Sequence, residues 1–358
     1  MSWIGLKTTD HSYFDAGGLA TPARKVDVPD DHAFLPRGTL LAEFTHHPVT
    51  ARRNLLRYAV RSPWPSSLTI CADPDGTFHL LQGQGDRSCA ASLPTDLVET
   101  DATIHVSFAW DAPARLGVFS IWVPDAGKLF QTEFRGPLPL SVKDADHLMA
   151  VRPTHLRIED FGFLAVSSAI EPAGPAPNIC AGAALTTPHG ATAIEDLKPG
   201  QMIITHSGDV AQVRWVGFQD LPAVGRFTPL SLRSPYHGLC EDITVSTEAR
   251  LILSGSEIEY LFGEEAVAVN VGHLADRQSV RINLNGPVVR YYQVLLDTAS
   301  VMNVNGAAIE SFDAQPILAD PHNVRHSVLR TIPAELLPQD TGLAMPVLRD
   351  FEALTLAR

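Results

Sequence analysis

Short runs of alternating apolar and polar residues fill the chain, and turn-forming residues separate them. The pattern is clearest at residues 103–110, where Ile104, Val106, Phe108 and Trp110 alternate with small or polar residues. A strand with one buried face has this period of two. Runs of similar length, spaced roughly ten residues apart and bounded by Pro, Gly and Asp, predict a mainly β protein.

The first half of the chain contains two predicted hairpins. Asp73-Pro74-Asp75-Gly76 separates one pair of runs, and its Asp-Gly step tolerates the positive φ angles of a tight turn. Pro124-Asp125-Ala126-Gly127 separates the other pair. Residues 1–35 are expected to be irregular. The strands expected in this half lie at residues 39–44, 68–71, 77–81, 103–110, 118–123 and 129–134. Their spacing predicts a β-sandwich.

A proline-rich stretch divides the chain almost in half. Pro172, Pro175 and Pro177 fall within six residues, and such a stretch continues neither a sheet nor a helix. We therefore predict a sandwich domain at residues 1–171, a linker at 172–179 and a second domain at 180–358. The second domain is expected to contain strands at residues 184–187, 202–205, 210–216, 243–246, 251–253, 267–269, 280–284 and 288–296, with helical turns at 194–197 and 334–337.

Composition and charge exclude several classes of partner. Apolar residues make up 45% of the 358 residues and charged residues 19%, which is typical of a globular protein. The net charge is −13, and acidic residues outnumber basic ones on both sides of the linker, so no nucleic-acid or anionic membrane partner is expected. No apolar run is long enough to span a membrane. Residues 1–10 lack a secretory signal pattern, which leaves a cytoplasmic location or signal-independent export.

The four cysteines are Cys71, Cys89, Cys180 and Cys240, and none forms a Cys-x-x-Cys pair. This spacing argues against a zinc ribbon or a thioredoxin-like redox site. Cys71 and Cys89 could form a disulfide, but free buried thiols are favoured in a chain without a secretion signal. His46-His47 has no third ligand at suitable spacing, so no metal is expected, and no cofactor is expected either.

Cys180 begins a succession of short motifs. The chain continues through Leu185-Thr186-Thr187, Ile194-Glu195-Asp196-Leu197, Ile203-Ile204-Thr205 and Val213-Arg214-Trp215-Val216-Gly217. This order resembles the start of a Hint domain, the module shared by hedgehog proteins and inteins, and it is closest to a bacterial branch with C-terminal Hint domains. Further similar segments extend the resemblance over about residues 178–350. The resemblance implies an all-β, horseshoe-like second domain.

The resemblance also implies self-processing. In this family the first thiol, here Cys180, attacks the preceding carbonyl, here that of Ile179, and an N-to-S acyl shift converts the peptide into a thioester. Such a step needs a positioned nucleophile, a general acid for the leaving nitrogen and donors for the oxyanion. The family takes its acid from a Ser/Thr-x-x-His motif, and a later histidine and an aspartate assist.

The histidine positions of that pattern are occupied by other residues here. Ser246-Thr247-Glu248-Ala249 places Ala249 at the acid position, and Gln293 and Ala299 stand at the later histidine positions. Asp297 matches the aspartate. General acid–base assistance contributes roughly 10²–10⁴ in rate, so cleavage is expected to be impaired.

The loss of the histidines leaves two alternatives for the second domain. In a shifted alignment, His237 of Ser234-Pro235-Tyr236-His237 would replace the missing acid. Otherwise the chain stays intact, and the Hint fold serves as the scaffold of a non-catalytic binding or structural protein. Cys180 would then be a small buried thiol.

The first half has a weaker resemblance of its own. Residues 105–111 and 118–123 are similar to strands of concanavalin-like jelly rolls, over about residues 35–145. Such folds often bind sugars on an aromatic face, which makes Trp110 and Trp122 candidates for binding a glycan. The alternation of the strands, however, places at least one of these rings in the core. A glycan or a protein is the ligand that the resemblance implies.

Overall fold

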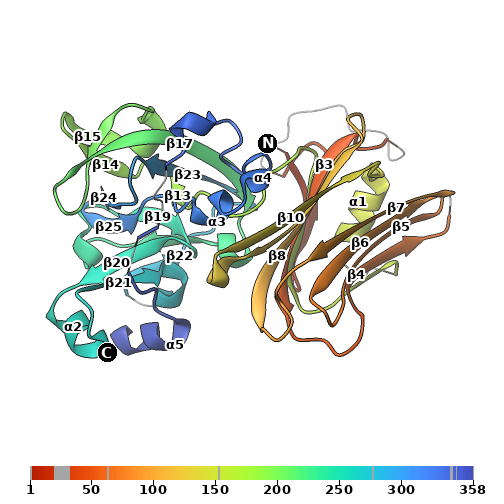
Figure 1. Ribbon diagram of the computed structural model, residues 1–358, viewed down its shortest axis with the longest axis horizontal. Helices are drawn as coiled ribbons and strands as arrows, with labels where there is room; N and C mark the ends of the chain where they lie inside the picture. Colours follow the sequence, from red (N-terminus) through yellow and green to blue (C-terminus); the bar gives the residue numbers. More distant parts are fainter. Residues whose placement is uncertain are drawn as a thin grey trace. The chain divides into compact units, whose positions relative to one another are not determined.

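A computed structural model describes residues 2–19, 33–62, 64–151, 154–275, 278–338, 342–343 and 345–357. Contacts divide the chain into two compact units, and each has its own apolar core. The first unit comprises Met1–Pro175 and Pro316–Ser327, and the second comprises Ala176–Gln315 and Val328–Arg358. The mainly β class predicted from the sequence is confirmed (Figure 1).

The first unit is a sandwich of two antiparallel sheets (Figure 1). One sheet contains, in order across it, β10 (Lys128–Arg135), β9 (Leu116–Val123), β8 (Ala102–Asp111), β3 (Arg37–His46), β12 (Phe161–Ser167), β1 (Trp3–Lys7) and β2 (Ser12–Phe14). The other contains β11 (Leu156–Ile158), β4 (Arg53–Val60), β5 (Ser66–Ala72), β6 (Thr77–Gln84) and β7 (Arg87–Pro94).

Alternate residues of both sheets form the core of the sandwich. Leu40 and Phe108 of one sheet and Ile70 and Phe78 of the other are fully buried in one cluster. Helix α1 (Val142–Met149) adds its apolar side to the same cluster. Such burial contributes about 25 cal/mol for each Å² of apolar surface removed from water, which makes it the main stabilising contribution.

A late segment of the chain returns to the sandwich. It contains α4 (Pro321–Val324), and its Asn323 side chain donates to the carbonyl of Leu129 on β10 over 3.1 Å. His326 Nε2 lies 2.9 Å from Glu133 Oε1 on the same strand. This return could not be predicted, because no local pattern in residues 316–327 specifies a partner almost two hundred residues away.

The second unit contains two further sheets around one core. The seven-stranded sheet has the order β16 (Met202–Ile204), β17 (Val210–Pro222), β23 (Val288–Leu296), β13 (Ile179–Cys180), β19 (Ile243–Ser246), β18 (Pro229–Leu232) and β22 (Val280–Ile282). The six-stranded sheet has the order β15 (Gly190–Ala193), β14 (Ala184–Thr187), β24 (Val301–Val304), β25 (Ala307–Glu310), β20 (Arg250–Ser254) and β21 (Ala266–Asn270).

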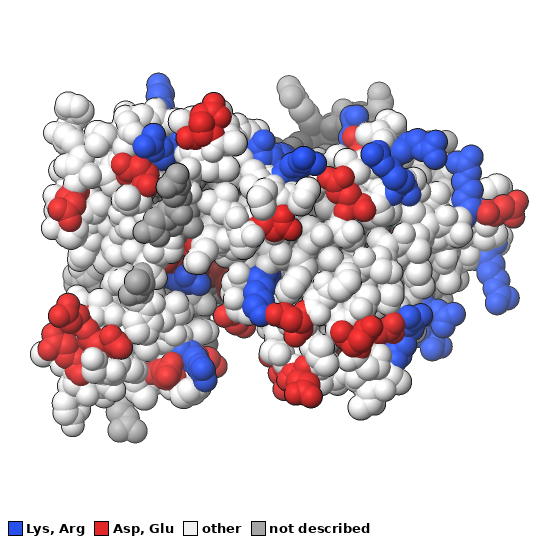
Figure 2. All heavy atoms as spheres, viewed as in Figure 1, with Lys and Arg blue, Asp and Glu red and all other residues white. Residues whose placement is uncertain are grey.

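The remaining helices are short. They are α2 (Ser256–Phe262), α3 (Gln315–Leu318) and α5 (Asp350–Ala353), with 3₁₀ turns η1 (Pro124–Ala126), η2 (Ile194–Asp196), η3 (Gly225–Phe227), η4 (Tyr236–Gly238), η5 (Val271–Leu274), η6 (Ala334–Leu336) and η7 (Leu354–Ala357). On the face shown in Figure 2, acidic side chains gather over α2, and elsewhere on it acidic and basic side chains are mixed. None of the described helices is long and apolar enough to cross a bilayer.

The local predictions can be compared with these elements. The hairpin around Gly76 is confirmed as β5 and β6, and Gly76 adopts a φ of +79°. The helical turns expected at residues 194–197 and 334–337 are present as 3₁₀ turns. The irregular structure expected for residues 1–35 is wrong for β1 and β2, whereas residues 20–32 lie outside the described part. The apolar residues of β1 pair with β12, a partner that is distant in sequence.

Candidate functional site

The Ile179–Cys180 peptide lies at the centre of the seven-stranded sheet of the second unit. It forms β13, which has β19 on one side and β23 on the other. Ile179 is opposite Val245 and Tyr292, while Cys180 is opposite Tyr291. The strand begins immediately after the proline-rich stretch, because prolines lack the N–H that a central strand must donate. The bond predicted to break is therefore held between two neighbouring strands.

The Cys180 thiol is half-buried and free. Burial raises its pKa to about 12. Since the thiolate is the nucleophile, this thiol is almost entirely in its unreactive form at neutral pH. The opposite residue, Tyr291, is completely buried, and burial together with nearby Cys180 raises the pKa of its phenol. Tyr291 Oη donates to the carbonyl of Phe227 over 2.9 Å.

The turn that follows Cys180 is fixed by two side chains. Gly182 has a φ of +87°, and its N–H donates to both carboxylate oxygens of Glu195, at 3.1 and 2.9 Å. Asn305 accepts from the N–H of Ala184 through its Oδ1, and its own N–H donates to the carbonyl of Ala184 over 2.8 Å. Both sides of the nucleophile position are thus anchored, one by the sheet and one by this turn.

Gln293 takes part in a polar contact beside β13. Its side chain is almost completely buried, and its Nε2 donates to Asn178 Oδ1 over 2.8 Å. Asn178, Tyr291 and Gln293 lie on the same face of the sheet as Cys180, because residues two apart on a strand share a face and opposite residues face the same way. The structure therefore places the predicted residues Cys180 and Gln293 on the same face of the sheet, on adjacent strands.

The position aligned with the family's acid lies in the apolar core. Ala249 is completely buried among apolar side chains. Its N–H donates to the carbonyl of Ser246 over 3.2 Å, so residues 246–249 form a tight turn. The Ser246 hydroxyl accepts from the N–H of Glu248, and the N–H of Ser246 donates to the carbonyl of Asn178. Ser246 thus contacts the residue that precedes Ile179, through its backbone.

His237 lies in η4 with a φ of +55°. Its Nε2 is buried and has no hydrogen-bond partner among the described residues, and burial lowers the pKa of the ring. The N–H of nearby Cys240 donates to the carbonyl of Asn305, the residue that also holds Ala184. The His237 loop is therefore linked by backbone contacts to the turn after Cys180.

Asp297 has a different set of partners. Its Oδ1 accepts from the N–H of Gln212 over 3.0 Å, and its own N–H donates to the carbonyl of Gln212. The carboxylate therefore fastens the end of β23 to β17. Ala299 follows it in the half-buried turn before β24.

The two tryptophans of the first unit differ in exposure. Trp110 is completely buried, and its Nε1 donates to the carbonyl of Leu35 over 2.9 Å, so its ring belongs to the core rather than to a glycan platform. The expectation that at least one ring faces inward is confirmed. Trp122 is half-buried on β9, opposite His105 and Leu129.

The sites considered for metals and disulfides have simpler roles. His46 Nε2 lies 3.1 Å from the carbonyl of Leu97, and His47 Nδ1 lies 2.7 Å from Asp101. Within the described ranges no cluster of three or more His, Cys, Asp or Glu side chains could hold a metal ion. All four cysteines are free thiols, as favoured from the sequence, but of Cys71 and Cys89 only Cys71 is buried.

Sequence reasoning missed several residues around Cys180. Tyr291 is the residue opposite Cys180, Glu195 binds the turn after it, and Asn178, two residues before it, binds Gln293. Glu195 lies within the Ile-Glu-Asp-Leu motif, whose two carboxylates were the local signal for a side chain able to accept two bonds. The partners of Asn178 and Tyr291 depend on strand register, which no local motif specifies.

Comparisons with known proteins bear on both units. Residues 177–316 match the family model of the Hint domain, which confirms the predicted resemblance for those residues. An intein-like domain from Clostridium thermocellum is similar at 15% identity, over 38% of this chain and 100% of that one, with a TM-score of 0.28. The CBM40 of a Ruminococcus gnavus sialidase is similar at 12% identity. The match covers 37% of this chain and 77% of that one, with a TM-score of 0.27. No curated protein matches this chain.

Proposed function

We propose that the Hint domain at residues 177–316 is of the self-processing type and that its cleavage step at Ile179–Cys180 is impaired. In this step the Cys180 sulfur bonds to the Ile179 carbonyl carbon, the C–N bond breaks, and the thiol proton passes to the leaving nitrogen. The observation that carries the proposal is the pairing of a centrally held Cys180 with the absence of an imidazole at Ala249, Gln293 and Ala299.

Two physical effects support the impairment. The pKa of the Cys180 thiol is about 12, so only a minute fraction is ionised at neutral pH. The leaving nitrogen also lacks the acid that contributes roughly 10²–10⁴ in rate. His237 stays a candidate substitute, but burial lowers its pKa, and the neutral ring that results is a weak proton donor. Ser246 and Asp297 are proposed to position the backbone, in line with their contacts to Asn178 and Gln212.

The test uses the full chain and intact-mass analysis. We expect one 38.7 kDa species after purification. Prolonged hydroxylamine treatment is expected to release a small amount of two fragments that meet at Ile179–Cys180, and the Cys180→Ala variant should release none. Comparison of the His237→Gln variant with the parent shows whether the His237 ring contributes to this cleavage.

Two results would contradict the proposal. Rapid and complete cleavage without added nucleophile would show that the step is not impaired. Failure of hydroxylamine to cleave the parent, together with failure of the restored variants described in the Discussion, would show that the domain is not of the self-processing type.

The alternative proposal is a non-catalytic binding protein. Here the chain stays intact, the Hint fold acts as a scaffold, and the sandwich of the first unit binds a glycan or a protein. The loss of all three histidine positions together favours it. Of the two tryptophans considered as ligand contacts, only Trp122 has an exposed part.

A further inference from the structure

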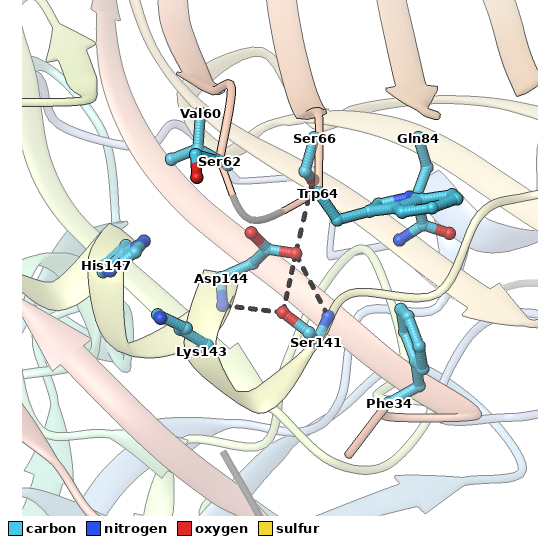
Figure 3. A pocket seen from close by; sticks show the side chains of 10 residues that line it. All are labelled: Phe34, Val60, Ser62, Trp64, Ser66, Gln84, Ser141, Lys143, Asp144 and His147. Carbon is cyan, nitrogen blue, oxygen red and sulfur yellow. Dashed lines mark hydrogen bonds between the residues drawn. The ribbon is translucent and has the colours of Figure 1, made fainter. Parts of the chain in front are cut away.

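The first unit contains a cavity of about 260 Å³, here called the Trp64 cavity. It lies where β4, β5 and β6 reach the first turns of α1 (Figure 3). The residues that decide its chemistry are Phe34, Trp64, Gln84, Lys143, Asp144 and His147. Ligand pockets for drug-sized molecules have volumes of roughly 300–1,000 Å³, so this cavity suits a ligand with a single ring.

The carboxylate of Asp144 is already occupied by donors from the protein. Its Oδ1 accepts from Tyr58 Oη over 2.6 Å. Its Oδ2 accepts from Ser141 Oγ over 2.8 Å and from Ser66 Oγ over 3.3 Å (Figure 3). Asp144 is also almost completely buried. Asp144 therefore joins α1 to β4 and β5. Its oxygens already accept hydrogen bonds from protein donors and are not available to a ligand.

The same network sets the tautomer of His147. His147 Nδ1 lies 3.2 Å from Tyr58 Oη. Because that hydroxyl donates its proton to Asp144, it accepts from His147, and Nδ1 carries the hydrogen. His147 Nε2 is then left as an acceptor. Gln84 offers a second acceptor, since its Nε2 donates to the carbonyl of Pro139 over 3.0 Å and its Oε1 stays available.

Lys143 supplies the donor at the cavity. No ion pair or hydrogen bond joins its ammonium group to another described residue, although Asp144 is its neighbour in sequence. The cavity thus presents one cation and one buried carboxylate, with acceptors on Gln84 and His147. A ligand of either net charge would meet a like charge, while a neutral ligand with several hydroxyl groups finds both donors and acceptors.

Two aromatic rings form the opposite side of the cavity. Trp64 is 60% exposed and Phe34 is 51% exposed. Figure 3 shows both rings on one side, away from His147 and Lys143. The Trp64 ring rests against Gly85, where an added Cβ would lie 2.5 Å from the ring, so the backbone holds it in place. Large exposed aromatics around a concave site are typical of ligand contacts.

We propose that the Trp64 cavity binds one neutral sugar ring, with its apolar face against Trp64 and Phe34 and its hydroxyl groups on Lys143, Gln84 and His147. The volume of the cavity, its two aromatic rings and its opposite charges all match a neutral ring with hydroxyl groups. Sugar binding there is independent of the fate of the Ile179–Cys180 bond, which lies in the other unit.

The test uses the full chain and saturation-transfer NMR with methyl glycosides of glucose, galactose, mannose and N-acetylglucosamine, and with glucuronate and N-acetylneuraminate as acidic comparisons. We expect at least one neutral glycoside to bind. Trp64→Ala and Lys143→Gln should each weaken binding about tenfold, which matches the loss of one good contact. Trp64→Phe should retain most of the affinity.

Matched controls come from the second unit. Tyr260 is 88% exposed, and Tyr260→Ala removes a ring outside the cavity; Lys198→Gln likewise removes an exposed cation. Neither should change binding. Absence of binding by every neutral glycoside, a preference for the acidic sugars, or unchanged binding by both cavity variants would each overturn the proposal. Because Trp64 and Lys143 lie outside the apolar core, thermal unfolding of these variants should match the parent.

Discussion

The Gln293 amide donates to Asn178 Oδ1 over 2.8 Å, two residues before Cys180. An amide–amide bond therefore lies at the position where the sequence comparison predicts a family histidine. Breaking a buried hydrogen bond leaves a partner unsatisfied and costs about 1–3 kcal/mol, so Gln293→Ala should lower the free energy of unfolding by that amount.

A double-mutant cycle measures the interaction energy between Asn178 and Gln293. Urea unfolding of Asn178→Ala, Gln293→Ala and the double variant is expected to show a coupling energy of at least about 0.5 kcal/mol, as contacting residues do. Purely additive effects would mean that the two side chains do not support each other.

The cysteines should differ strongly in reactivity. The pKa of Cys180 is raised to about 12 by burial, whereas the side chain of Cys240 is exposed. At pH 8, iodoacetamide should modify Cys240 at least roughly tenfold faster than Cys180, because only the thiolate reacts. The Cys180 rate should rise with pH well above the ordinary thiol range, and unfolding in urea should remove the difference. Peptide mass mapping over time measures the modification rates of Cys180 and Cys240. Equal rates in the folded chain would refute the burial of Cys180.

Restoring the missing acid should restore cleavage. Ala249→His adds an imidazole at the acid position, and hydroxylamine-induced cleavage before Cys180 is expected to rise by roughly 10²-fold or more. Ala249 is completely buried, so the larger side chain should also destabilise the unit by about 1–3 kcal/mol. Ala249→Leu is the control for this overpacking and should be cleaved no faster than the parent.

Gln293→His provides a second route to the same result. Gln293 already hydrogen-bonds to the Asn178 side chain, so an imidazole there has a polar neighbour. Cleavage in either variant must disappear when Cys180→Ala is added. Cleavage that persists without Cys180 would assign the break to another reaction.

The sequence predicted those features that depend on local chemistry. The Asp73–Gly76 turn needs a positive φ at Gly76, and the residues alone reveal this. Helix α1 had an equally local signal that was missed: Ser141 and Asp144 form a capping box at its N-terminus. Its eight residues are too few for helical periodicity to stand out.

Long-range pairing could not be predicted in the same way. The positions of Cys180, Ala249 and Gln293 followed from motif order, but the choice of Asn178 as the partner of Gln293 depends on how β13 and β23 align. A shift of one residue would send Gln293 to the other face of the sheet. By contrast, alternation placed Trp110 on the apolar face of its strand with Ile104, Val106 and Phe108, and its complete burial agrees with that pattern.

Trp110 should matter for stability rather than for ligand binding. Its ring packs against Gly38, where an added Cβ would lie 2.3 Å from the ring. Trp110→Ala is expected to destabilise the first unit by about 3–5 kcal/mol, as for other large buried aromatics. Gly38→Ala should destabilise it by about 1–3 kcal/mol through overpacking. Thermal unfolding compares them with the half-buried control Trp122→Phe, and a Trp110→Ala variant as stable as that control would contradict the assignment.

Two half-buried carboxyl groups should give the second unit a distinct response to pH. Burial raises the pKa of Glu310 and of Asp313, even though Arg250 lies 3.1 Å from Glu310 and 3.8 Å from Asp313. The folded state therefore holds these protons to a higher pH than the unfolded chain does. By linkage, their contribution to stability is fully present below the ordinary carboxyl range near pH 4 and declines as pH rises towards the raised values.

Glu310→Gln replaces the carboxyl group with a neutral amide. It should therefore remove part of the decline in stability as pH rises. The variant's unfolding free energy, relative to the parent, is expected to increase by roughly 1 kcal/mol per pH unit above about pH 4, until the parent carboxyl is ionised in the folded state as well. Glu257→Gln, at an exposed position on α2, should leave the slope unchanged. Urea unfolding between pH 4 and 7 measures the difference. If stability changed with pH equally in Glu310→Gln and in the parent, Arg250 would offset the effect of burial completely. The ion pair, and not desolvation, would then determine the protonation of Glu310.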